Sequence, residues 1–256
     1  EQKVLHEESY LVSATQTSRL VVITGRRRVG KTELILRTMR DEQGIPFIYL
    51  FASRIAPGAL IKDWLQTIAS VLGTSFAPQC ERLSQVIEYL LFLGKTQRIN
   101  VAIDECQDLN MIEPSFWSEV QKVWDINKRS SQVFLMMSGS IASAMRNIFN
   151  EYSEPLYGRV DRFIQVRPFG ISVLEEILND YHPRFSPDDL LGLYSVTGGI
   201  PWFVEDLMDR GATTIKKMAE SIFQSGSKFI MDGEILLANE FRSEGAVNRT
   251  LLQARG

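Results

Sequence analysis

Residues 25–32, which read GRRRVGKT, have the types and the spacing that bind the phosphates of a nucleotide. Gly25 and Gly30 let the backbone curl so that successive N–H groups point at a phosphate oxygen. Lys31 adds a positive charge, and the hydroxyl of Thr32 is placed to coordinate Mg²⁺. The pattern therefore predicts a phosphate-binding loop, or P-loop. The alternative is an ordinary turn between a strand and a helix.

The sequence on either side of this loop matches what a P-loop requires. Residues 20–23 form an apolar run that is typical of a buried strand, and residues 33–36 begin a helical pattern. A helix that starts near Lys31 presents its unpaired N–H groups and the positive end of its dipole to the same phosphate. We predict that ATP or ADP is held here, with Mg²⁺, by Gly25, Arg26, Arg27, Arg28, Val29, Gly30, Lys31, Thr32 and Glu33.

Two adjacent carboxylates, Asp104 and Glu105, follow the apolar run at residues 99–103. The carboxyl end of a strand is where a nucleotide-binding α/β sheet places its metal chemistry. We expect Asp104 to hold Mg²⁺ through water and Glu105 to polarise the water that attacks the γ-phosphate. The alternative is that the two residues merely start a solvated turn, and the P-loop earlier in the chain favours catalysis.

Two further residues are candidates for contact with the γ-phosphate. Ser138 follows the apolar run at 133–137, where P-loop ATPases carry a polar sensor side chain; the alternative is an ordinary turn with Ser140 as a helix N-cap. Arg159 precedes the apolar run at 163–166, and we expect it to face the nucleotide edge of the sheet. A guanidinium there would neutralise transition-state charge as an arginine finger does, in its own chain or in a neighbour. A solvated charge run is the other interpretation.

The composition is that of a globular protein, and it narrows the classes of function. The 256 residues are 45% hydrophobic and 23% charged, and no apolar run is long enough to cross a bilayer. A net charge of −3 argues against a nucleic-acid surface over the whole protein but leaves a local basic patch open. Cys80 and Cys106, the two cysteines, form no zinc or disulfide pattern, so we expect a cytoplasmic protein.

Apolar runs and helical periodicity alternate as far as about Phe169, and only helical periodicity follows. The alternation predicts an α/β fold with five strands. The later residues predict a small helical lid, in which Ser186 and Pro187 start one of the helices. We therefore expect a core at residues 1–168, and the lid with the start of a further segment at residues 169–256.

A short glycine-rich turn interrupts the predicted helices of the lid at residues 198–201. Two glycines before a proline at a helix start permit close approach of the backbone to a flat group. We predict that Gly199, Ile200 and Pro201 contact the adenine base. The alternative is a plain turn between two helices.

Taken together, these motifs resemble the prokaryotic P-loop ATPases often called archaeal ATPases, which are related to the AAA+ and STAND groups. The segments that carry the resemblance are GRRRVGKT, INVAIDE, LMMSGS, PLYGR and GGIP, in this order over most of the chain. The resemblance implies a three-layer α/β/α core with a five-stranded parallel sheet, followed by a helical lid. It also implies hydrolysis of ATP that drives a conformational change. The alternative is an ATP-gated regulatory switch, or a module that binds a partner or DNA, with incidental turnover.

The same resemblance sets expectations for the two ends of the chain and for partners. An aromatic-x-x-Arg-Glu box that helps to hold the base would end at about Glu1, and a winged-helix segment would begin near Ala246. We expect the chain to be a fragment, because it starts with Glu1 rather than Met and stops after Gly256. The partners that the family admits are a second copy of the chain and, through the winged helix, DNA or another protein. No membrane contact is expected.

Overall fold

The computed structural model describes residues 1–224, 227 and 229. The expected start of a winged helix near Ala246 lies outside the described residues. The chain divides into two compact units. The core unit comprises residues 1–25 and 31–166, and the lid unit comprises residues 26–30 and the chain from residue 167 onward. The tip of the P-loop thus groups with the lid unit, which the sequence did not indicate.

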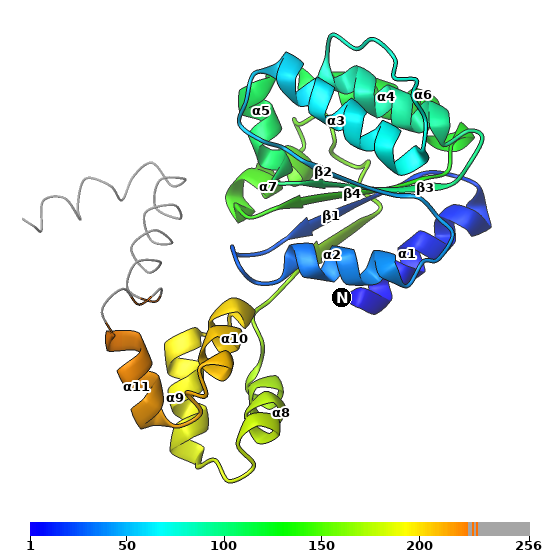
Figure 1. The fold of residues 1–256 in the computed structure, drawn as a ribbon. Coiled ribbons are helices and arrows are strands. Elements are labelled where there is room, and N and C mark those ends of the chain that lie inside the picture. Colours follow the sequence, from blue (N-terminus) through cyan, green and yellow to red (C-terminus); the bar gives the residue numbers. More distant parts are fainter. Residues whose placement is uncertain (225–226, 228, 230–256) are drawn as a thin grey trace, which may run out of the picture. The chain divides into compact units, whose positions relative to one another are not determined.

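A five-stranded parallel sheet forms the centre of the core unit (Figure 1). Its strands lie in the order β2-β3-β4-β1-β5, and every neighbouring pair is parallel. This arrangement confirms the predicted α/β fold with a five-stranded parallel sheet. The strands are β1 (Arg19–Thr24), β2 (Phe47–Phe51), β3 (Ile99–Asp104), β4 (Val133–Gly139) and β5 (Arg162–Gln165).

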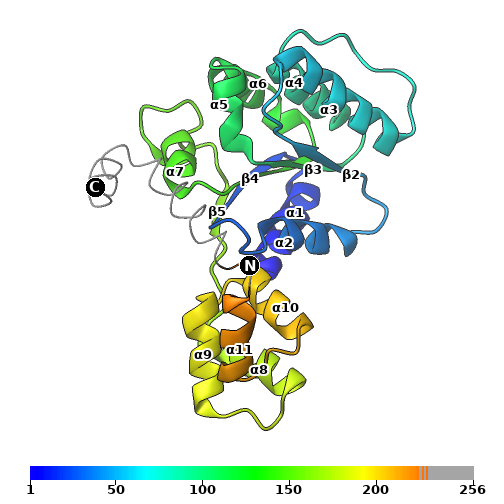
Figure 2. The same cartoon turned by 60° about the vertical axis from the view of Figure 1, so that its left-hand side comes forward.

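Helices cover both faces of this sheet (Figures 1 and 2). The helices on one face are α1 (Gln2–Thr15) and α2 (Lys31–Arg40). Those on the other face are α3 (Pro57–Leu72), α4 (Leu83–Leu93) and α6 (Phe116–Asn127). Because helices cover both faces, β3 and β4 are buried along their whole length, which explains their unbroken apolar runs.

Short elements complete the core unit. They are the 3-10 turn η1 (Cys106–Asp108), the single-turn helix α5 (Leu109–Ile112), the 3-10 turn η2 (Lys128–Ser130) and the helix α7 (Ala142–Asn150). The sequence did not predict η1 or α5, because three or four residues are too few to show a helical period.

The local sequence of α3 shows why these helices form where they do. Pro57 lies in the first turn, where its missing N–H has no helical partner to lose. Leu60, Trp64 and Ile68 recur at helical spacing and are buried, and each contributes roughly 1.5–3 kcal/mol of burial free energy. Gly73 ends the helix with φ 64, a left-handed conformation that a glycine adopts at little cost.

The lid unit contains four helices within its described residues, α8 (Ile171–Tyr181), α9 (Pro187–Thr197), α10 (Pro201–Asp209) and α11 (Ile215–Phe223). Their apolar faces share one small core that includes Leu174, Leu193 and Leu207. Ser186 caps α9 as the sequence predicted, since its hydroxyl accepts a hydrogen bond from the N–H of Asp189. The carboxylate of Asp189 in turn accepts the N–H of Ile215 at 2.8 Å, and this bond ties the start of α11 to α9.

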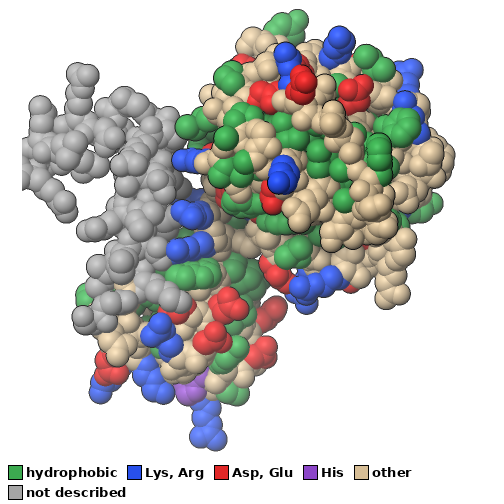
Figure 3. All heavy atoms as spheres, turned by 45° about the horizontal axis from the view of Figure 1, so that its top comes forward, with side chains coloured by type: hydrophobic (Ala, Val, Ile, Leu, Met, Phe, Trp, Pro, Cys, Tyr) green, Lys and Arg blue, Asp and Glu red, His purple; other side chains and the backbone are tan. Residues whose placement is uncertain are grey.

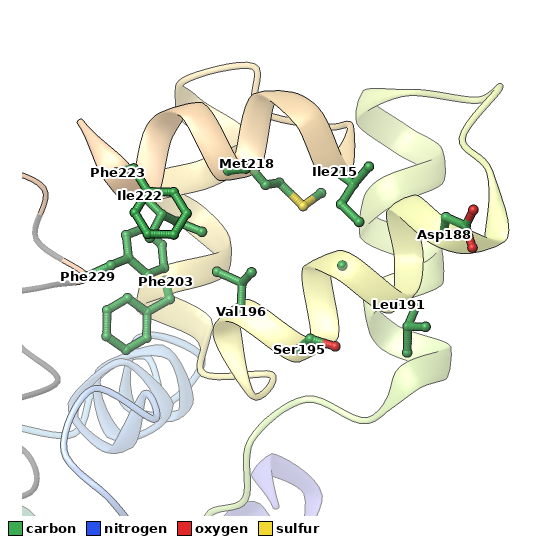
Figure 4. Close-up of a pocket in the computed structure, with 12 residues that line it drawn as sticks. Asp188, Leu191, Ser195, Val196, Phe203, Ile215, Met218, Ile222, Phe223 and Phe229 are labelled. Carbon is green, nitrogen blue, oxygen red and sulfur yellow. The ribbon is translucent and has the colours of Figure 1, made fainter.

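An apolar groove of about 730 Å³ lies within the lid unit between α9, α10 and α11 (Figure 4). Phe203 of α10 stacks on Phe229 at the wall of this groove, with the ring centroids 4.8 Å apart.

Basic and acidic side chains are interspersed on the face that Figure 3 shows. Within the described residues, no helix combines the length and the apolar character that crossing a membrane requires.

Candidate active site

The carboxyl ends of four strands meet at one edge of the sheet, directly beside the start of the P-loop. The strand registers pair Thr24 of β1 with Gly139 of β4, and Phe51 of β2 with Asp104 of β3. Gly25 follows Thr24 in the chain, so the P-loop leaves the sheet at this edge. Polar residues at the ends of these strands are therefore brought together although they are far apart in sequence.

Lys31, the first residue of α2, is folded back toward the start of the P-loop. It is 6% exposed, and its Nζ donates a 2.9 Å hydrogen bond to the carbonyl oxygen of Gly25. Gly30 has φ 94, a conformation that glycine adopts without strain. Arg28 has φ 68, which is rarer for a residue with a side chain. The curled backbone and the buried ammonium would suit a loop that surrounds an anion.

Asp104 is the centre of the polar contacts in the core unit. Its Oδ2 accepts hydrogen bonds from the hydroxyls of Thr32 at 2.8 Å and Tyr49 at 2.6 Å. Its Oδ1 accepts from the hydroxyl of Ser138 and, at 2.9 Å, from the backbone N–H of Glu105. Burial by itself would raise the pKa of Asp104, but these four hydrogen bonds outweigh it and hold the pKa below its ordinary value. Asp104 is therefore ionised at neutral pH.

Glu105 leaves β3 through a sharp bend. Its φ of 53 lies in the left-handed region, which costs a residue with a side chain about 1–2 kcal/mol. Its Oε2 accepts hydrogen bonds from the hydroxyl of Ser140 at 2.7 Å and from the amide of Gln107 at 2.6 Å. Asp104 and Glu105 thus have separate sets of side-chain donors, although they are adjacent in sequence.

The residues around Asp104 fit Mg²⁺. This ion prefers hard oxygen ligands and usually takes only one or two from the protein, with the others from phosphates and water. The hydroxyl of Thr32 and the carboxylate of Asp104 are in direct contact and offer such oxygens. Among the described residues, no group of three or more His, Cys, Asp or Glu side chains is arranged to hold a metal. This set of ligands suits an ion that enters together with phosphate groups.

Arg54 is a cation near this edge that the sequence did not single out. It lies just after β2, and its guanidinium makes two hydrogen bonds to Asp108, at 2.7 and 3.0 Å. These bonds to the Asp108 carboxylate, with a contribution from the charge of Glu105, raise the pKa of Arg54. The Arg54 guanidinium therefore stays charged and paired with Asp108.

Sequence reasoning also missed Tyr49 and Gln107, and it gave Ser140 a different role. The only signal for Tyr49 was a hydroxyl within the apolar run FIYLF, two residues before the end of a strand. Gln107 lies in η1, which was not predicted. Ser140 was considered as a helix N-cap, which is wrong: the N-cap of α7 is Ile141, and the Ser140 hydroxyl binds Glu105 instead.

Arg159 lies at the opposite edge of the sheet from the P-loop, so the expectation that it faces the nucleotide edge is wrong. In the parallel sheet β5 begins beside the start of β1, and the N–H of Asp161 donates to the carbonyl of Leu20. The six residues of β1, at about 3.3 Å each, separate this edge from the P-loop by roughly 20 Å. The Arg159 guanidinium makes two hydrogen bonds to Asp125, at 2.7 and 2.9 Å.

Within the lid unit, the backbone of the glycine-rich turn packs closely against another group, as its sequence suggested. That group is the backbone of Phe169. A Cβ atom on Gly199 would lie 2.2 Å from the carbonyl oxygen of Phe169, and its φ is 73, so a side chain does not fit. The N–H of Phe169 donates to the carbonyl of Gly199 at 2.8 Å. Next to Pro201, the guanidinium of Arg28 lies over the ring of Trp202, 3.9 Å from the ring centroid.

A family model and one curated relative match most of this chain. A family model described as an ATPase domain predominantly from Archaea matches residues 10–207. An uncharacterised protein of Methanocaldococcus jannaschii is 28% identical over 186 residues, which cover 72% of this chain and 38% of that protein. The chain thus spans well under half the length of this curated relative.

Two solved structures share the fold at low sequence identity. The Walker-type ATPase of Pyrococcus abyssi is 21% identical with a TM-score of 0.57, over 97% of this chain and 74% of that one. The ORC2 protein of Aeropyrum pernix, solved as ADPNP and ADP complexes, is 12% identical with a TM-score of 0.58, over 85% of this chain and 66% of that one.

Proposed function

The chain belongs to the family of ATPase domains found predominantly in Archaea, and from this premise we propose that it hydrolyses ATP to ADP and phosphate to drive a conformational change. The observation that carries the proposal is the convergence on Asp104, where hydroxyls from α2, β2 and β4 meet one carboxylate beside the P-loop. A buried carboxylate is costly to desolvate, so packing alone does not favour an aspartate at the end of a strand. An aspartate with this set of donors suits a divalent cation bound with phosphate.

We assign the phosphates to the P-loop and to the start of α2. The backbone N–H groups of residues 25–33 would surround the phosphates, and the ammonium of Lys31 would move from the Gly25 carbonyl to them. Thr32 and Asp104 would hold Mg²⁺, Thr32 directly and Asp104 through water. When bound, Mg²⁺ neutralises charge that develops on the phosphate oxygens.

Glu105 would act as the base for the attacking water. Its carboxylate accepts a proton as the water oxygen forms a bond to the γ-phosphorus, and the bond from that phosphorus to the β–γ bridging oxygen breaks. Ser138 would support this step through its hydrogen bond to Asp104. Arg159 would contribute only to the site of a neighbouring copy, because it lies at the far edge of its own sheet.

The base of the nucleotide would contact Gly199, Ile200 and Pro201 in the lid unit. Ile200 is the N-cap of α10 and Pro201 its first residue, so the backbone here is fixed by the helix start. We also propose a cytoplasmic location, because the two cysteines of the chain are both unpaired, which suits a reducing compartment.

Calorimetry with ATP and Mg²⁺ tests the phosphate assignment. Lys31→Ala should lose at least roughly tenfold in affinity, about 1.4 kcal/mol, because it removes the buried ammonium. Lys62→Ala, which removes an exposed lysine from α3, is the matched control and should bind as the parent does. Equal affinity for Lys31→Ala and the parent would show that the P-loop assignment is wrong.

The steady-state rate of phosphate release tests the catalytic assignment. Glu105→Gln keeps the size of the side chain but cannot accept a proton, so turnover should fall by a factor of about 10² or more with binding retained. Parental turnover in this variant would remove Glu105 from the mechanism.

A second candidate function is an ATP-gated switch in which turnover is incidental. The observation that favours it is that Arg28, in the P-loop, stacks on Trp202 of the lid helix α10. If a loop binds phosphate and also contacts a lid helix, nucleotide binding at the loop can change the position of that helix. Small-angle scattering with ADP and with a non-hydrolysable ATP analogue tests this function. A different shape with the two nucleotides, together with slow turnover, supports the switch. Assembly with a second copy is a further proposal, which the mass obtained from the same scattering data tests. Binding of DNA or of a protein partner is another.

A further inference from the structure

Two donors from different segments converge on one oxygen of Glu105. The hydroxyl of Ser140, just after β4, and the amide of Gln107, in η1, both bind Oε2, at 2.7 and 2.6 Å. We propose that Ser140 and Gln107 are positioning residues that fix the Glu105 carboxylate by Oε2 and leave Oε1 to take the proton of the attacking water. The proposal rests on the role of Glu105 as the base.

The chemistry of the three groups fixes the direction of both hydrogen bonds. An ionised carboxylate only accepts, so the Ser140 hydroxyl and the Gln107 amide nitrogen must donate. Bonds to a charged acceptor are stronger than neutral ones, and two of them on one oxygen restrict rotation about the last torsion of the side chain. Because the backbone of Glu105 is also held in the left-handed region, the carboxylate has little freedom left.

The amide of Gln107 is itself held in place by its surroundings. Gln107 is 7% exposed, and a Cβ atom on Gly139 would lie only 2.3 Å from its Oε1. The same Cβ would lie 2.3 Å from the sulfur of Met145. Gly139 therefore makes the space in which the amide is packed, which gives the last residue of β4 a specific reason to be glycine.

The segment Ser138-Gly139-Ser140 thus serves both carboxylates. Side chains two residues apart on an extended chain point to the same side. Ser138 donates to Asp104 and Ser140 donates to Glu105, while the glycine between them makes room for Gln107. This division of contacts accounts for each of the three residues.

Steady-state kinetics combined with calorimetry tests the proposal. Ser140→Ala and Gln107→Leu should each lower kcat about tenfold, the value of one hydrogen bond to a charged group, and should leave the KM and the affinity for ATP nearly unchanged. Ser140→Thr keeps the hydroxyl and should restore kcat. Ser70→Ala and Gln66→Leu, which alter exposed residues of α3, are the matched controls and should match the parent.

A double-mutant cycle separates this proposal from the assignment of Glu105 itself. In a Glu105→Gln background, measured by single turnover, Ser140→Ala should have no further effect, because the group that it positions no longer takes a proton. Loss of turnover in Glu105→Gln with parental kcat in both Ser140→Ala and Gln107→Leu would overturn the positioning role. Parental turnover in Glu105→Gln would instead overturn the assignment of the base. If Gln107→Leu fails to fold, the Ala and Thr variants of the half-buried Ser140 still decide the question.

Discussion

The hydroxyls of Thr32 and Tyr49 donate to the same oxygen, Oδ2 of Asp104, at 2.8 and 2.6 Å. One hydroxyl comes from the helix that follows the P-loop and the other from β2, the outermost strand on one side of the sheet. If Thr32 becomes a ligand of Mg²⁺, a lone pair of its hydroxyl oxygen binds the metal and its O–H can still donate to Asp104. The phenol of Tyr49 then holds the same carboxylate oxygen without binding the metal. Burial and the adjacent Asp104 raise the pKa of Tyr49, so the phenol stays a donor at any physiological pH.

Tyr49→Phe should therefore weaken the binding of Mg²⁺ in the presence of ATP. Removing one hydrogen bond to a charged group costs about 1.5 kcal/mol, which corresponds to roughly a tenfold higher Mg²⁺ requirement. A titration of ATP binding against Mg²⁺ concentration measures this requirement in the parent and in Tyr49→Phe. Tyr89→Phe, on α4, is the control. An unchanged Mg²⁺ requirement in Tyr49→Phe would show that the phenol does not support the metal site.

Nucleotide binding should change the fluorescence of Trp202. The chain has four tryptophans; Trp64, Trp117 and Trp124 are at most 4% exposed, whereas Trp202 is half-buried under the guanidinium of Arg28. Phosphates in the P-loop attract that guanidinium, so the cation–π contact should weaken and the emission should shift. Emission spectra recorded with and without ATP measure the change. A change that persists in Trp202→Phe would trace the signal to a buried tryptophan instead.

Arg159→Ala should affect turnover only where copies of the chain assemble. Its guanidinium binds Asp125 at the edge remote from its own P-loop, so any contact with a γ-phosphate is with that of another copy. A mixture of Arg159→Ala and Lys31→Ala should then recover turnover, and the loss in Arg159→Ala alone should be on the order of a thousandfold. Specific activity measured over a range of protein concentrations gives the answer. Parental turnover in Arg159→Ala at all concentrations would leave Arg159 with the Asp125 ion pair alone.

Asp189→Asn should destabilise the lid unit by about 1 kcal/mol at neutral pH, since Asp189 completes the cap of α9 and binds the N–H of Ile215. Hydrogen bonds from the backbone of Ser186, joined by those from Ile215 and the Ser186 hydroxyl, hold the pKa of Asp189 below its ordinary value. A depressed folded-state pKa stabilises the fold above the unfolded pKa of about 3.9, and this stabilisation is lost as the pH falls through the folded-state value.

Thermal unfolding of the parent and of Asp189→Asn, measured from neutral to acidic pH, tests this linkage. The difference in unfolding temperature between the parent and Asp189→Asn should be largest at neutral pH and should shrink below about pH 4. Asp188→Asn, at the exposed neighbour in the first turn of α9, is the control and should show little effect. A difference that does not depend on pH would show that the charge of Asp189 is not what matters.

Local patterns predicted the strands, most helices and the cap at Ser186, because each depends on residues close together in sequence. They also indicated that Asp104 and Ser138 lie at the ends of two strands. The structure shows their side chains in contact. Whether these residues act on a nucleotide is still a prediction.

The contacts that sequence reasoning missed depend on strand order and register instead. Tyr49 reaches Asp104 only because β2 and β3 are adjacent and in a particular register. Ser140 and Gln107 meet at Glu105 because β3 and β4 are neighbours. Arg159 was placed wrongly because it precedes β5. In a parallel sheet the residues before a strand lie at its amino end, whereas the P-loop follows the carboxyl end of β1.

The position of β1 in the sheet has a consequence for synthesis of the chain. This strand, which leads into the P-loop, pairs with β4 and β5, and these are made more than a hundred residues after it. During translation β1 therefore has neither of its neighbours until most of the core unit has been made. Contacts of such long sequence separation form slowly and leave apolar strands exposed meanwhile. A nascent chain that ends before Val133 should accordingly retain no nucleotide, and it should be the form that depends most on chaperones.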